Sequence, residues 1–104
     1  MLLNLLEVHE EIEYNNKAGA KKVFSLRNVV VNRRFITFMR EDSAMNSYLQ
    51  DGLLPSSLDK NQRFTRISIA RGNIGQDLVV VGDLAQVTSW FNSEDGNKKK
   101  TLKG

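Results

Sequence analysis

Alternating apolar and polar residues mark the beginning of the chain. From Leu6 to Tyr14, the apolar side chains fall on one side of an extended chain, and three glutamates and a histidine fall on the other. Only Glu10 interrupts the apolar side. A period of two predicts a strand with one solvated face. The opening leucines also approximate one helical face, but a helix would crowd the glutamates together, so we favour the strand.

Two further apolar stretches follow a turn-forming segment, NNKAGAKK. They are VFSLRNVVV and FITFMR, and the polar residues 32–34 separate them. Both stretches are rich in β-branched or aromatic residues, which predicts strands. We expect either two strands around a tight turn or one strand with a bulge.

Residues 41–62 break the strand pattern. They hold the only proline, Pro55, and several turn-forming residues. Ser43 is placed to cap a short helix that Gly52 would end. The apolar face of that helix would consist of Met45, Tyr48 and Leu49. We expect a long middle loop or short helix with a structure or function of its own, because unstructured connections of this length are uncommon in compact domains.

A glycine-containing loop lies between two apolar stretches in the second half of the chain. FTRISIA alternates, whereas DLVVVGD is a continuous apolar run that is typical of a central strand. Gly72 and Gly75 lie between them. Two interpretations of this loop are open: it binds phosphate, or it is only a turn between two strands. No Lys-Ser or Lys-Thr follows, the GxGxxG fingerprint is absent, and strands flank the loop on both sides. We therefore predict a β-hairpin with glycine and asparagine at positive φ.

A helix is predicted over residues 83–92. Asp83 and Gln86 have the spacing of a capping box. The apolar face of this helix would hold Leu84, Val87 and Phe91, with Trp90 beside it.

These elements predict one small β-rich α+β domain over residues 1–92. We expect about five antiparallel strands in a half-open barrel or sandwich, one C-terminal helix at 83–92, and the long middle loop or short helix at 41–62. Residues 93–104 carry a lysine run and one apolar residue, so we expect a flexible basic tail.

Composition narrows the class of protein. The chain has 104 residues, of which 40% are hydrophobic and 26% charged, as in an ordinary soluble domain. It has no cysteine, which excludes disulfides and thiolate metal sites. No apolar run approaches the ~20 residues that a membrane helix needs, and the first residues lack the features of a signal peptide. We expect a cytoplasmic protein without membrane association.

Charge is distributed in blocks along the chain. Residues 1–14 hold four glutamates and no lysine or arginine, whereas residues 15–40 hold seven basic residues and no acidic one. The second basic block lies in residues 63–82. The two basic blocks could share a surface that binds a polyanion. The two basic blocks could instead pair with the acidic first block across a sheet, which needs fewer assumptions and is our preferred interpretation.

Catalytic and metal chemistry have little support in the sequence. Glu7, His9 and Glu11 would share one face of the first strand, and carboxylates with an imidazole can bind a metal ion. A solvated strand face has the same pattern, however, and His9 is the only histidine. We see no nucleophile or paired carboxylates in a recognisable arrangement. We expect no enzyme activity, no metal and no cofactor.

Two non-catalytic functions remain. The preferred hypothesis is a self-associating structural or adaptor module, because a small sheet with long apolar strands has edges that must be covered. Residues 41–62 could add a contact to another protein. The alternative is a small nucleic-acid-binding regulator, in which basic and aromatic residues hold a single strand on an open sheet face. Its candidate residues are Arg33, Arg34, Lys60, Arg63, Arg66 and Arg71.

Overall fold

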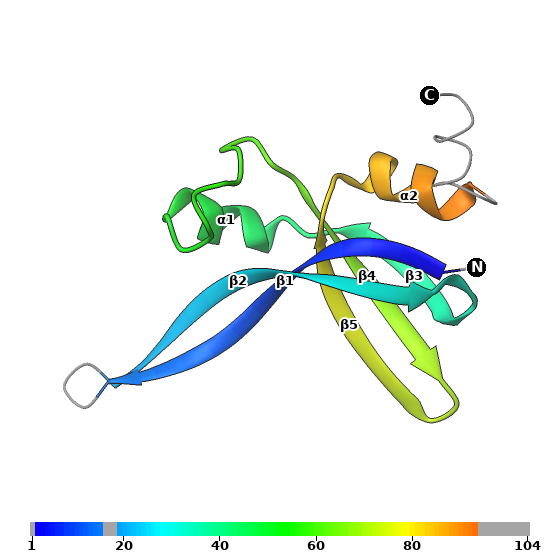
Figure 1. Cartoon of the computed structure of the whole chain (residues 1–104), viewed down its shortest axis with the longest axis horizontal. Helices are drawn as coiled ribbons and strands as arrows, with labels where there is room; N and C mark the ends of the chain where they lie inside the picture. Colours follow the sequence, from blue (N-terminus) through cyan, green and yellow to red (C-terminus); the bar gives the residue numbers. More distant parts are fainter. Residues whose placement is uncertain (1, 16–18, 94–104) are drawn as a thin grey trace.

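A five-stranded antiparallel sheet forms the body of the protein. The structure is a computed structural model that describes residues 2–15 and 19–93. Along the sheet, the strands follow the order β2-β1-β5-β4-β3 (Figure 1). The elements in chain order are β1 (Leu2–Asn15), β2 (Gly19–Asn32), the 3₁₀ helix η1 (Arg33–Phe35), β3 (Ile36–Glu41), α1 (Ala44–Gln50), β4 (Phe64–Arg71), β5 (Ile74–Val81) and α2 (Leu84–Asn92).

The predicted fold class is confirmed. The sheet has five antiparallel strands, a helix follows the last strand, and a short helix lies in the middle segment. The strand with the continuous apolar run, β5, is central in the sheet, as expected. The predicted basic tail lies outside the described residues from position 94 onward.

β1 and β2 form a long hairpin that extends away from the rest of the molecule (Figure 1). Each strand has 14 residues, and the register is unbroken from Leu2 opposite Asn32 to Asn15 opposite Gly19. The predicted strand is therefore present, although it begins at Leu2 and not at Leu6. Residues with even numbers share one face of this hairpin, and residues with odd numbers share the other.

The segments before and after residues 32–34 are two strands, as in the first of the two interpretations, but they do not pair with each other. β2 and β3 are the opposite edges of the sheet, and η1 connects them. The Asn32 side chain accepts a hydrogen bond from the Arg34 N–H and holds this turn. Because three residues span at most about 10 Å, the two edges approach each other at this corner. The sheet is therefore curled into a half-open shape.

The concave side of the curled sheet holds the larger hydrophobic core. All five strands and α2 contribute to it, and Ile67, Val80 and Val87 are fully buried there. α2 closes this side, and the predicted capping box is present: Asp83 Oδ1 accepts from the Gln86 N–H at 2.7 Å. Trp90 packs against this core together with Val87. Neither helix in the described part of the chain is long and apolar enough to cross a membrane.

A second core lies on the opposite side of the sheet. α1 and the loop after it cover Val8, Phe24 and Phe64 there, and their own Met45 and Leu54 are buried in the contact. The middle segment thus has its own structure, and it uses its apolar side chains mainly to cover this sheet.

The ends of α1 agree only in part with the prediction. Ser43 precedes the helix, but its side chain makes no capping hydrogen bond. Asp42 takes that role, since its Oδ1 accepts from the Met45 N–H at 3.0 Å. Gly52 follows the helix with φ +76°, as expected for a residue that ends a helix.

The glycine loop is a two-residue turn between β4 and β5, as predicted. Gly72 has φ +62°, but Asn73 has no positive φ, so the expectation for the asparagine was wrong. One positive φ at the first central position is the pattern of a type II′ turn, which needs glycine only there. A strand follows this turn, so the loop lacks the helix that a phosphate-binding loop requires.

Candidate interaction surfaces

Oppositely charged side chains connect the two strands of the hairpin. Arg27 Nε lies 2.9 Å from Glu7 Oε1, and the Glu7 side chain is only 9% exposed. Lys22 Nζ lies 3.9 Å from Glu10 Oε2 and donates to the Tyr48 hydroxyl at 3.2 Å. The hydrogen bond to Tyr48, followed by the charge of Glu10, raises the pKa of Lys22. The preferred interpretation of the charge blocks is therefore confirmed for Arg27 and Lys22 of the first basic block. It is wrong for Arg63 and Arg66 of the second block, which pair with carboxylates outside residues 1–14.

Two of the six candidate nucleic-acid residues face carboxylates of the same chain. Arg63 forms an ion pair with Glu41 at the start of β4. Arg66 Nη2 lies 2.8 Å from Asp42 Oδ2, and Arg66 Nη1 lies 3.4 Å from Asp77 Oδ2. Both positive charges are therefore partly neutralised before any ligand arrives.

A polar cluster continues from Arg66 across β4 and β5. Ser68 Oγ donates to Asp77 Oδ1 at 2.7 Å. This hydrogen bond, followed by the contact with Arg66, lowers the pKa of Asp77. On β3, the guanidinium of Arg40 stacks over the Phe38 ring at 4.6 Å. This face carries charges of both signs, which does not suit a polyanion.

The remaining candidates are divided between two parts of the molecule. Arg33 Nη1 donates to the carbonyl of Phe91 at 3.0 Å and to that of Ser93, so it serves the C-terminal end of α2. The guanidinium carbon of Arg71 lies 5.4 Å from the centroid of the Phe35 ring. Arg34, which directly precedes Phe35 in the chain, is exposed.

Lys60 is exposed in the loop after α1, on the side of the molecule where β4 begins. The start of β4 is roughly 25 Å from its end at Arg71, at about 3.3 Å per residue. The six residues thus do not form one continuous basic surface.

The possible metal site on β1 does not assemble. His9 Nε2 lies 3.9 Å from Glu11 Oε2, while Glu7 is engaged by Arg27. Within residues 2–15 and 19–93, no three acidic or histidine side chains converge as metal ligands would.

Exposed apolar side chains concentrate on one face of the hairpin. The described residues contain seven large hydrophobic side chains that are well exposed, and four of them have even numbers on β1 or β2. These four are Leu2, Ile12, Tyr14 and Val30, with exposures of 61%, 53%, 79% and 54%. α1 covers the middle of this face, so the apolar residues remain open at its two ends.

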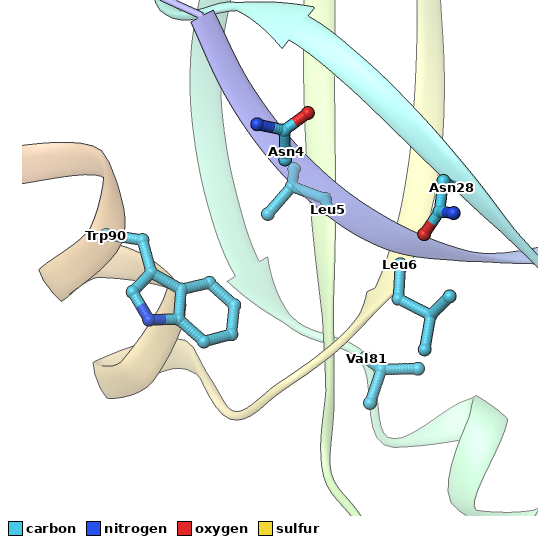
Figure 2. Close-up of a pocket in the computed structure, with 6 residues that line it drawn as sticks. All are labelled: Asn4, Leu5, Leu6, Asn28, Val81 and Trp90. Atoms are coloured by element: carbon cyan, nitrogen blue, oxygen red, sulfur yellow. The ribbon is translucent and has the colours of Figure 1, made fainter. Parts of the chain in front are cut away.

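A cleft of about 620 Å³ lies where β1 separates from β5 (Figure 2). Trp90 of α2 points toward Leu5 from one side, and Leu6 and Val81 face each other on the other side. The lining residues are Asn4, Leu5, Leu6, Asn28, Val81 and Trp90. None of them is charged.

Sequence reasoning anticipated that the sheet has edges to cover, without identifying the edge strands, and it missed this cleft. Asn4 and Asn28 come from two strands, and only the pairing of Leu6 with Asn28 brings them to one place. Trp90 was expected beside the apolar face of its helix, but no local pattern shows that it borders a cleft. No protein-family model, curated protein or solved structure matches this chain, so its surfaces are the basis for assigning a function.

Proposed function

We propose that the protein is a non-catalytic module that associates with a second copy of itself through the β1–β2 hairpin. The observation that carries this proposal is the exposure of Leu2 and Val30 together on one face of that hairpin, next to the outer edge of β2. Apolar side chains that gather on one face, and not singly over the surface, are typical of interaction sites. Burying them in a dimer removes this apolar area from water.

The outer edge of β2 supplies a matching geometry. β2 is an edge strand, its register with β1 has no bulge, and it contains no proline, so its outward main-chain groups can pair with another strand. The segment NVVVN at residues 28–32 reads the same in both directions. In a two-fold antiparallel contact centred on Val30, valine meets valine and asparagine meets asparagine.

The charges that flank this segment are compatible with such a contact. A contact centred on Val30 would place Arg27 opposite Arg33 of the second copy, and like charges at close range would oppose association. Arg27 is already paired with Glu7, and Arg33 is already bonded to the carbonyls at the end of α2. Both guanidinium groups therefore have local partners that reduce their repulsion.

Light scattering on the protein as it leaves a sizing column tests the proposal. We expect the wild type to have twice the chain mass of 11.8 kDa at micromolar concentration. Val30→Lys places a charge on the edge strand and should return the mass to that of one chain. Ile74→Lys is the matched control, because Ile74 is 75% exposed at the turn between β4 and β5, away from the hairpin. This control should remain dimeric.

Two results would contradict the proposal. A wild-type protein that elutes as one chain at micromolar concentration would remove self-association as the function. A species with excess absorbance at 260 nm would instead favour nucleic-acid binding. In that case, charge reversal at Arg34 and Arg71, which flank Phe35, should abolish the salt-dependent affinity.

A further inference from the structure

A stretch of β1 beside the cleft lacks a strand partner on one side. β1 pairs with β2 along its whole length, but its register with β5 is confined to Glu7 opposite Val80. In the described part of the chain, residues 2–6 therefore have a neighbouring strand on one side only. Alternate residues of a strand direct their N–H and C=O groups to opposite sides, so the side that faces the cleft carries main-chain groups with no strand opposite them.

On the opposite wall of the cleft, the main-chain groups of Gly82 are already hydrogen-bonded. The Gly82 N–H donates to the carbonyl of Arg63 at 3.0 Å, and the Gly82 carbonyl accepts from Thr65 Oγ1 at 2.9 Å. The ring of Trp90 lies so close to this glycine that an added Cβ would sit 3.3 Å from two ring atoms. This wall is packed and its main chain is satisfied, so a strand that enters the cleft can pair only with β1.

The side chains around the cleft suit an uncharged ligand with amide groups. Asn4 and Asn28 are exposed, and their carboxamides make no hydrogen bond to another described residue. A carboxamide both donates and accepts, as a peptide group does. The remaining lining is aliphatic or aromatic, and a charged ligand would lose hydration there without an opposite charge to compensate.

We propose that this cleft binds an extended, uncharged peptide segment that adds to β1 as a further strand. Residues 2–6 offer about five positions at ~3.3 Å each, and the volume of 620 Å³ falls within the roughly 300–1,000 Å³ of ligand sites. The main chain of the peptide would bond to β1 and to the carboxamides of Asn4 and Asn28. An apolar side chain of the peptide would contact Trp90. Strand addition of this kind is a recurrent mode of peptide recognition.

Trp90 makes the proposal measurable, because it is the only tryptophan in the chain. The probe is an acetylated and amidated hexapeptide of alternating threonine and valine. We expect its titration into the full chain to change the emission of Trp90 in a saturable way. Introducing charges into the cleft with Asn4→Asp and Asn28→Asp should weaken binding about tenfold or more. Asn73→Asp, at the turn far along β5, is the matched control and should bind as the wild type does.

A second probe keeps the test independent of whether the variants fold. The same hexapeptide with every residue nitrogen methylated keeps its side chains but has no main-chain N–H on either edge to donate to a strand, so it should leave the emission unchanged. Equal binding of both peptides would overturn strand addition. The proposal also fails if neither peptide changes the emission of Trp90 at millimolar concentration. If a neutral disaccharide such as maltose changes the emission and the peptides do not, the ligand of the cleft is not a peptide.

Discussion

At the scale of single residues, Asp77 shows how neighbours change the chemistry of an exposed carboxylate. It accepts a hydrogen bond from Ser68 and lies beside Arg66, and both contacts favour its charged form. A carboxyl group whose pKa is lower in the folded state stabilises the fold above its unfolded pKa of about 3.9. That contribution is lost as the pH falls through the lowered folded value. The stabilisation by Asp77 is therefore present at neutral pH and disappears in acid.

Ser68→Ala removes the largest cause of the lowered pKa. We expect the pKa of Asp77 to rise toward its ordinary value in this variant, measured by carboxyl-carbon NMR during an acid titration. Ser56→Ala, at an exposed loop position, should leave that titration unchanged. A Ser68→Ala protein whose Asp77 titrates as in the wild type would mean that Arg66 alone holds the carboxylate charged.

At the scale of elements, Asp42 connects α1 to the sheet. One carboxylate oxygen caps the helix at Met45, and the other accepts from Arg66 on β4. The side chain is only 3% exposed. It therefore fixes where the helix begins and how it sits on the outer side of the sheet.

Asp42→Ala should lower the free energy of unfolding by about 1–3 kcal/mol, because it removes a helix cap and leaves Arg66 without its closest carboxylate. Ser43→Ala is the control, since the Ser43 side chain makes no capping bond, and it should change stability by less than about 0.5 kcal/mol. Urea unfolding of the two variants measures the difference. A loss in Ser43→Ala as large as the loss in Asp42→Ala would contradict the assignment of the cap to Asp42 alone.

Elements that depend on neighbours in sequence could be predicted, and their arrangement could not. The capping box at Asp83 and the alternation in β1 are local, and both are present in the structure. The choice between Asp42 and Ser43 depends on Arg66, which lies far along the chain. The cleft depends on the point where β1 leaves β5, and a single pairing at Glu7 decides that point. Contacts between segments that are far apart in the chain do not produce a periodic pattern in the sequence.

At the scale of the whole molecule, the outer half of the hairpin is its least supported part. Residues 10–14 are exposed and pair only with β2, whereas Ile67 and Val80 are fully buried at the centre of the sheet. Local opening is easiest where main-chain hydrogen bonds have few buried apolar neighbours. A two-stranded ribbon that leaves the body is such a region.

Amide hydrogen exchange should follow this gradient. We expect amides of residues 10–14 to exchange about tenfold or more faster than those near Ile67 and Val80 in the separated chain, measured by NMR with the Val30→Lys variant. In the wild type, amides of β2 that face outward should slow if a second copy covers that edge. Uniform protection along the whole hairpin of the separated chain would contradict the gradient.

The single pairing between β1 and β5 also determines the order in which the chain can complete its fold during synthesis. β1 and β2 precede β5 in the chain, so translation finishes both strands of the hairpin before it makes Val80. Until then, β1 and β2 can pair with each other, but the strand that connects them to the rest of the sheet is missing. The hairpin is therefore complete before the strand that joins it to the rest of the sheet has been made.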